Sequence, residues 1–310
     1  MKVFVTGSTG VVGRRGVSLL VNAGHDVTAL ARTPAKAKFL GSIGARAVAI
    51  SLFDVGALTN ALAGHEAICN LATAIPSVRR FGRKSAWVQN DLVRTLGSQS
   101  LVDAANAAGV IRIIQESITF LYADAGEQWI NERALIEPST TGRSALLAEA
   151  QVQRFVEGGG AGVILRFGSF YGPDSSHTLA ALGLARHGIA SNLGRESAYL
   201  SPLTTDDAAA AVLLALTAPT GTYNVVDDEP LTRREYFDSL AVALGRKHLR
   251  LLPAFVGSLG GPASSMVTRS QRVSNSKFKE TTGWSPAYPS ARQGWRFVVG
   301  AFEGGGESAT

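Results

Sequence analysis

The stretch Lys2-Val-Phe-Val-Thr-Gly7-Ser-Thr-Gly10-Val-Val-Gly13 decides the fold. In it a short apolar run leads directly into three glycines at intervals of three, and a helical pattern over Val11–Asn22 follows. A turn this tight requires positive φ, and the missing side chains let backbone N–H groups approach a pyrophosphate at the helix N-terminus. A glycine-rich connector without a ligand is the alternative. The position between a first strand and a first helix favours a dinucleotide-binding loop.

The end of the second predicted strand indicates which dinucleotide is bound. An Asp or Glu there would accept hydrogen bonds from the ribose 2′-hydroxyl, but the chain has Arg32, followed by Lys36. Because a guanidinium presents two parallel donors to a phosphate, we predict NADP(H) in preference to NAD(H). A solvated Arg at a strand end is the alternative. Asp54 suits either acceptance from the adenine amino group or the N-cap of a helix over Val55–Leu62.

Short apolar runs alternate with amphipathic ones through the first half of the chain. The apolar runs are continuous, which indicates strands buried on both faces, and their alternation with helices implies right-handed crossovers and a parallel sheet. The predicted strands are Val3–Val5, Asp26–Ala31, Ala45–Ile50, Ala67–Leu71, Ile111–Gln115 and Gly162–Arg166. The predicted helices are Val11–Asn22, Ala35–Ile43, Val55–Leu62, Trp87–Ala108 and Ser144–Glu157.

The regularity weakens beyond Tyr171. We therefore predict an α/β fold with two parts: a doubly wound parallel Rossmann sheet in residues 1–170, and a smaller, discontinuous C-terminal substrate lobe in residues 171–310, some elements of which return to the first part. The elements predicted in the second part are helices near Thr178–His187, Asp206–Leu216 and Arg233–Leu244 and a strand over Thr222–Val226. A mobile loop is expected over Gly257–Ser265, and Gly304–Thr310 should fray.

Composition excludes several classes of protein. The 310 residues are 45% apolar and 17% charged, which suits a globular core, and the net charge of +6 comes from bases that are mostly scattered, which argues against a nucleic-acid binder. No apolar stretch approaches the length of a membrane span, and Met1 leads at once into the first strand, so we expect a cytoplasmic protein with no membrane contact. A single Cys69 and histidines without ligand spacing indicate no metal site.

Several landmarks carry a family resemblance. The motif from Thr6 to Gly13 resembles the fingerprint of extended short-chain dehydrogenases/reductases, the NAD-dependent epimerase/dehydratase-like group. Asn70-Leu71-Ala72-Thr73 resembles the turn after the family's fourth strand, beside the cofactor, and Leu165 to Pro173 resembles the stretch after its sixth strand. Together with the loop and the second strand, the resemblance implies a cofactor-binding set: Gly7, Thr9, Gly10, Val11, Val12, Gly13, Arg32, Lys36, Asp54, Val55, Leu71, Ala72, Thr73, Asn90 and Phe167.

The family's catalytic residues are missing from their expected positions. The resemblance implies a Tyr-x-x-x-Lys pair, in which the Tyr exchanges a proton with the substrate and the Lys lowers its pKa. Alignment of Gly142–Glu149 with the family's helix places Thr141 at the Tyr position and Ala145 at the Lys position. A Thr hydroxyl is a far weaker acid than a phenol, and Ala145 supplies no charge. The chain therefore resembles the atypical members of the superfamily, which keep the nucleotide fold and lose the dyad.

Other residues could supply the missing acid. We predict Tyr122 as the replacement, with Ser117 and Thr119 orienting a carbonyl, because the resemblance places their loop at the ligand-binding edge of the sheet. Packing against the lobe is the alternative for Tyr122, and capping or core hydrogen bonding for the two hydroxyl residues. The basic run from Arg79 to Lys84 suits either an anionic substrate group or a charged surface loop.

Three functions remain open at this point. The first is an NADP(H)-dependent oxidoreductase or epimerase-like enzyme acting on a small carbonyl or hydroxyl substrate through a non-standard acid/base set. The second is a non-catalytic NADP(H)-binding sensor, and the third is a non-redox isomerase or lyase on the same scaffold. The resemblance also implies a possible homodimer through the helices over Trp87–Ala108 and Ser144–Glu157.

Overall fold

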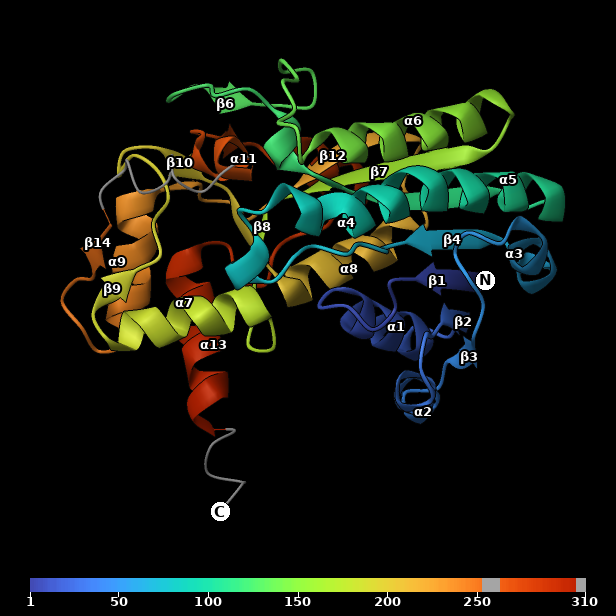
Figure 1. Ribbon diagram of the computed structural model, residues 1–310, viewed down its shortest axis with the longest axis horizontal. Helices are drawn as coiled ribbons and strands as arrows, with labels where there is room; N and C mark the ends of the chain where they lie inside the picture. The colour runs from blue at the N-terminus through green and yellow to red at the C-terminus, as the bar shows by residue number, and fades with distance from the viewer. Residues whose placement is uncertain (253–262, 305–310) are drawn as a thin grey trace.

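A seven-stranded parallel sheet forms the centre of the molecule (Figure 1), in a computed structural model that describes residues 1–252 and 263–304. The strand order is β12-β7-β5-β4-β1-β2-β3, and every pairing in the sheet is parallel. The strands are β1 (Lys2–Thr6), β2 (Asp26–Leu30), β3 (Arg46–Val48), β4 (Ala67–Asn70), β5 (Arg112–Ile118), β7 (Ala161–Phe167) and β12 (Gly221–Val225). The α/β, doubly wound fold class predicted from the sequence is confirmed.

Helices cover both faces of this sheet, and alternate strand residues feed the two cores. Phe4 of β1 packs with Leu58, Leu101 and Phe155 on one face. Its neighbours Val3 and Val5 pack in the opposite cluster, with the helices of the other face. The helices of the first face are α3 (Val55–Leu62), α5 (Ser98–Ala108) and α6 (Arg143–Glu157), and those of the second are α1 (Gly13–Asn22), α2 (Pro34–Ser42) and α8 (Thr205–Ala215).

The predicted helix Trp87–Ala108 is interrupted. It consists of α4 (Val88–Leu92), a π-helical turn over Val93–Gly97, and α5. The turn carries Arg94 into the interior, where its Nη2 lies 2.6 Å from Glu116 Oε1 of β5. An amphipathic pattern cannot reveal such a turn, because the extra residue in it changes the helical period only locally.

The remaining elements form the lobe. Its core contains Leu182, Phe237, Leu240 and Trp295, from three helices that Figure 1 shows beside one another. The helices of the lobe are α7 (Ser176–Arg186), α9 (Arg233–Ala243), α11 (Ser264–Thr268) and α13 (Ala291–Gly304), whereas α12 (Ser276–Thr282) packs against β12 of the sheet. Its short strand pairs are β6 (Trp129–Ile130) with β15 (Arg272–Val273), β8 (Ser169–Tyr171) with β11 (Pro202–Thr204), β9 (Ile189–Ala190) with β14 (Arg250–Leu251), and β10 (Tyr199–Leu200) with β13 (Leu231–Thr232).

Besides α12, two elements from the second half of the chain belong to the sheet and its helices. Strand β12 pairs with β7 at the edge of the sheet, and α8 packs against α1. Most of the loop predicted over Gly257–Ser265 and nearly all of Gly304–Thr310 lie outside the described residues. Among the helices of the described ranges, none is long and apolar enough to cross a membrane.

Candidate functional site

The glycine loop forms a backbone cradle between β1 and α1. Gly7 has φ +64°, and a Cβ built on it would lie 2.2 Å from the carbonyl oxygen of Leu71, so this position accepts only glycine. A Cβ on Gly13 would lie 2.1 Å from the oxygen of Gly7, which shows how closely the first turn of α1 approaches the loop. The loop closes through a hydrogen bond from Gly10 N to Gly7 O of 2.9 Å.

Buried side chains hold the cradle in place. Thr6 Oγ1 donates to Asn70 Oδ1 at 2.5 Å, and the Asn70 amide donates to Gln115 Oε1 at 2.8 Å, so the ends of β1, β4 and β5 are tied together. Ser8 Oγ donates to the carbonyl of Leu30 at the end of β2. These bonds keep the carboxyl ends of four neighbouring strands in register around one concave surface.

A cavity of about 280 Å³ occupies this surface, and we call it the loop cavity. Of the predicted cofactor residues it is lined by Gly7, Thr9, Gly10, Arg32, Lys36, Leu71, Ala72 and Thr73. The remaining lining residues were not predicted: Thr6, Ser8, Leu30, Ile50, Ser51, Leu52, Phe53, Gln89 and Val93. The stretch 50–53 follows the third predicted strand, so the rule that ligands gather at the carboxyl ends of parallel strands would have found it.

The other predicted cofactor residues lie outside this lining, for different reasons. Asp54 Oδ1 accepts from Ala57 N at 2.9 Å, so its side chain caps α3, which was the alternative interpretation. Asn90 is buried and accepts from Ala74 N, which fixes the turn after β4. The Phe167 side chain is fully buried in the core, with its ring tilted against that of Phe170, and it does not line the loop cavity. Val11, Val12 and Gly13 form the entry to α1, and Val55 begins α3.

Tyr122 and Ser117 lie in a buried network instead of at a cavity. Arg166 forms a bidentate ion pair with Glu149, with distances of 2.9 and 2.6 Å, and Ser117 Oγ donates to the same carboxylate at 2.5 Å. Arg166 Nη1 also donates to the Tyr122 hydroxyl, which in turn donates to Asn224 Oδ1 at 2.7 Å. We call these residues the Arg166–Glu149 network.

This network corrects the predicted acid. The Tyr122 side chain is 0% exposed, and burial raises the pKa of its phenol, although the neighbouring Arg166 acts in the opposite direction. Ser117 and Thr119 are also buried. None of the three residues lines the loop cavity or the second cavity, of about 420 Å³, that lies in the lobe. The structure therefore assigns Tyr122 the packing alternative and Ser117 the core hydrogen bond.

The dyad position itself is filled by apolar packing. Thr141 lies under α11, with its hydroxyl 4.0 Å from the sulfur of Met266, and Ala145 is buried in a cluster with Trp87 and Leu121. Thr141 is only 2% exposed. Thr141 and Ala145 thus stand where the Tyr and Lys are expected, and helix α11 covers both positions.

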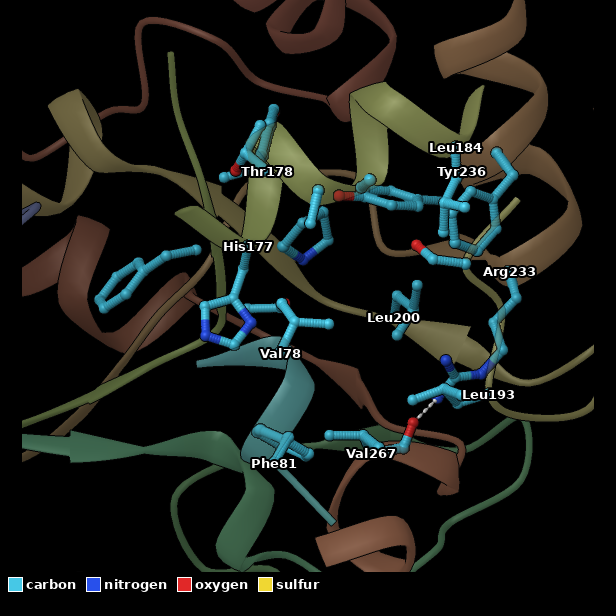
Figure 2. Close-up of a pocket in the computed structure, with 18 of the residues that line it drawn as sticks. Val78, Phe81, His177, Thr178, Leu184, Leu193, Leu200, Arg233, Tyr236 and Val267 are labelled. Atoms are coloured by element: carbon cyan, nitrogen blue, oxygen red, sulfur yellow. Dashed lines mark hydrogen bonds between the residues drawn. The ribbon is translucent and has the colours of Figure 1, made fainter. Parts of the chain in front are cut away.

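A second cavity of about 420 Å³ lies in the lobe, and we call it the lobe cavity (Figure 2). It is bounded by Phe120 after β5 and by residues 169–171 of β8, so it opens at the same edge of the sheet as the loop cavity. Its walls are mostly apolar and include Val78, Phe81, Leu184, Leu193, Leu200, Tyr236 and Trp295. The polar groups that stand out are His177 and Arg233, on opposite sides of the view in Figure 2.

Burial alters the ionisation of both polar residues. It lowers the pKa of His177, although a hydrogen bond to the carbonyl of Pro76 opposes the shift, so its imidazole is neutral at pH 7. Burial also lowers the pKa of Arg233 to about 10, which still leaves the guanidinium charged at neutral pH. The lobe cavity therefore holds one full positive charge in apolar surroundings.

The basic run predicted as a possible anion site does not line the lobe cavity. Arg79, Arg80, Arg83 and Lys84 are exposed, while Val78, Phe81 and Gly82 between and beside them face the cavity. Arg233 was not among the predicted site residues. It stands next to Arg234 in the sequence, and no local pattern distinguishes the buried residue from its exposed neighbour.

The geometry defines a Rossmann fold with a backbone cradle at the glycine loop and a second, mostly apolar cavity in the lobe. A family model described as NAD(P)H-binding matches residues 7–154. A curated relative from Streptomyces sp, "3-diazoavenalumate denitrifying reductase", is 31% identical over 306 residues, which are 95% of this chain and 99% of the relative.

Solved structures agree on the fold. UDP-glucose 4-epimerase from Thermotoga maritima superposes with a TM-score of 0.81 at 20% identity, over 98% of this chain and 99% of that one. The human epimerase family protein SDR39U1, solved with NADPH, gives a TM-score of 0.81 at 21% identity, over 97% of this chain and 99% of that one. This chain belongs to the NAD(P)H-binding, epimerase/dehydratase-like short-chain dehydrogenases/reductases, as an atypical member, which confirms the resemblance seen in the sequence.

Proposed function

We propose that this chain is an NADPH-dependent reductase that transfers hydride to a small aromatic electrophile without a proton from the protein. The observation that carries the proposal is the dyad position, where Thr141 and Ala145 lie buried under α11. Reduction of a carbonyl generates an alkoxide, which requires an acid or an oxyanion site. An electrophile that loses a neutral leaving group after hydride addition requires neither.

An aryl diazonium group has this property. Hydride from the nicotinamide C4 forms a C–H bond at the ring carbon, the C–N bond breaks, and its electron pair departs with N2 while NADPH becomes NADP⁺. No proton enters or leaves the substrate. The name of the 31% identical relative, a denitrifying reductase of a diazo compound, supports this class of substrate for the present chain.

The choice of NADPH rests on the loop cavity. Arg32 and Lys36 line it, and within the described part of the chain no carboxylate forms an ion pair with either. Both cations are thus free to meet a 2′-phosphate. A non-redox isomerase or lyase would leave the nicotinamide unchanged, so isotope transfer from the nicotinamide to the product separates the proposal from that alternative.

The experiment uses 4-carboxybenzenediazonium and NADPH deuterated at C4. We expect NADP⁺ and benzoate in equal amounts, with deuterium at the ring carbon that carried nitrogen, and no deuterium in that position when the label is supplied by D2O instead. Product without deuterium from the cofactor would contradict hydride transfer. Saturable NADPH binding with no product would leave a cofactor-binding protein in place of an enzyme.

A further inference from the structure

Three arginines of the described chain are almost fully buried, and one of them lacks a counter-ion. Arg94 is paired with Glu116, and Arg166 with Glu149, each through hydrogen bonds to both carboxylate oxygens. Arg233, 5% exposed, has no ion-pair partner among the described residues. The Asp124 carboxylate attracts the Arg233 charge and so opposes the lowering of its pKa, but it forms no hydrogen bond with the guanidinium.

The guanidinium of Arg233 is only partly satisfied. Nη2 donates to the carbonyl oxygens of Val267 and Arg269, at the C-terminal end of α11. Nε is buried with no acceptor. A buried charge without a partner is strongly destabilising, and hydrogen bonds to two neutral carbonyl groups offset only part of that cost. The protein keeps this charge inside without a carboxylate of its own, which indicates that an anion from outside completes the site.

The surrounding chain is shaped to hold the guanidinium at the lobe cavity. Arg233 is the first residue of α9, whose N-terminus is fixed by a capping box between Thr232 and Glu235. A Cβ on Gly194 would lie 2.8 Å from Nε, so the glycine leaves the space that the guanidinium fills. Asn192 bonds both the N–H and the carbonyl of Gly194 and so fixes this loop. In Figure 2 the Arg233 side chain extends from α9 to the cavity wall between Leu193 and Val267.

The rest of the lobe cavity specifies the body of the ligand. Its volume of about 420 Å³ suits a single ring with a short chain, and Phe81, Tyr236 and Trp295 offer aromatic surfaces. The other ionisable side chains with resolved shifts in this lining are neutral at pH 7, because burial lowers the pKa of His177 and raises the pKa of the Tyr171 and Tyr236 phenols. One uncompensated positive charge matches a monoanionic carboxylate, whereas a phosphate dianion would leave a buried negative charge.

We propose that Arg233 is a substrate-binding residue that clamps the carboxylate of a small aromatic acid in the lobe cavity. Because Nη2 already donates to two carbonyl oxygens, the carboxylate accepts a charge-assisted hydrogen bond from the rest of the guanidinium, and the apolar wall holds the ring away from water. The inference rests on the proposed function in taking the lobe cavity as the substrate site. Carboxylate binding requires no turnover, so it can be tested apart from hydride transfer.

The test is calorimetric titration of the full chain, with NADP⁺ present, with cinnamate, cinnamamide and phenyl phosphate. The acid and the amide have the same ring and chain and differ in charge. We expect cinnamate to bind about tenfold or more tightly than cinnamamide and than phenyl phosphate. In Arg233→Gln the acid should lose about tenfold or more in affinity while the amide binds as before, and Arg233→Lys should recover part of the loss.

Arg234→Gln is the matched control. Arg234 is the next residue of α9, but its side chain pairs with Glu196 at the surface, so its loss should change neither affinity. Unchanged amide binding shows that the cavity of Arg233→Gln is intact. Equal binding of acid and amide by the unmodified chain, no binding of either, tighter binding of phenyl phosphate, or an Arg233→Gln variant that keeps its cinnamate affinity would each overturn the clamp. Acid-over-amide selectivity without deuteride transfer would remove only the proposed reaction.

Discussion

The two cavities of this chain are built in opposite ways. The loop cavity is centred on the glycine loop from Thr6 to Gly10, and its other lining residues lie within the first 93 residues, mostly just after β2, β3 and β4. The lobe cavity is made of side chains from segments between Val78 and Trp295 that are far apart in the sequence. A backbone cradle tolerates few substitutions and binds a constant cofactor, whereas a wall of side chains can change its ligand one residue at a time. The following experiments test this contrast.

The largest effect is expected in the backbone cradle. Gly7→Ala places a Cβ 2.2 Å from the Leu71 carbonyl, so we expect loss of detectable NADPH binding in a titration. Gly64→Ala is the matched control, because Gly64 also has positive φ, +74°, but has nothing within 4 Å of a built Cβ. It should lose only about 1 kcal/mol of unfolding free energy and keep the cofactor. Equal cofactor affinities in the two variants would contradict the cradle.

The next effect concerns the buried Arg166–Glu149 network, which separates structure from chemistry. Arg166→Met leaves the Glu149 carboxylate buried and unpaired, and we expect a loss of about 3–5 kcal/mol in the free energy of unfolding by urea.

Tyr122→Phe leaves Asn224 and Arg166 each without one hydrogen-bond partner and should lower the free energy of unfolding by about 1–3 kcal/mol. Because Tyr122 is buried away from both cavities, the turnover number of the Tyr122→Phe variant should stay within about twofold of that of the unmodified chain. A loss of all turnover in a folded Tyr122→Phe would restore it as the acid.

A moderate effect is expected where the loop cavity does depend on a side chain. Arg32→Asp replaces the donor to the 2′-phosphate by a repelling carboxylate, so NADPH affinity should fall by about tenfold or more while NADH affinity is kept or improved. Lys38→Asp is the control, since Lys38 is exposed and does not line the cavity. Fluorescence titration with both cofactors measures the change. An unaltered ratio of the two affinities in Arg32→Asp would refute the 2′-phosphate assignment.

The smallest effect concerns a buried acid in the lobe. Burial raises the pKa of Asp227 well above its ordinary value, and the nearby Asp228 and Glu229 carboxylates act in the same direction. The folded state therefore favours the neutral acid, and the free energy of unfolding falls as the pH rises from the unfolded-state pKa towards the raised one. Asp227→Asn removes this loss, so its melting temperature should exceed that of the unmodified chain by a few degrees at about pH 8 and match it at about pH 4.

Asp228→Asn serves as the comparison for that measurement. Asp228 forms a surface ion pair with Lys279 at 2.8 Å and also repels the Asp227 carboxylate, so these effects oppose each other and Asp228→Asn should gain less stability at about pH 8 than Asp227→Asn. If the difference in melting temperature between Asp227→Asn and the unmodified chain is the same at every pH, the Asp227 carboxyl has the same pKa in the folded and the unfolded state.

The sequence predicted the sheet well because its strands are continuously buried. All seven predicted strands and the helix over Val55–Leu62 lie within three residues of the observed bounds, and the cradle residues of the loop cavity were identified from their spacing. The side chains of Tyr122 and Phe167 lie away from both cavities for a shared reason. Resemblance placed both at the ligand-binding edge of the sheet, but whether a side chain points outward or into the core depends on partners such as Arg166 and Phe170.

The sequence by itself determined the parallel sheet, the dinucleotide loop and the loss of the Tyr and Lys, since each depends on residue type at a local spacing. Only the tertiary structure decided that α11 covers the vacated dyad position, that Tyr122 faces a buried ion pair, and that Arg233, not Arg234, lines the lobe cavity. Burial and charge pairing are sums over contacts between segments far apart in the chain, and a local pattern contains no record of them.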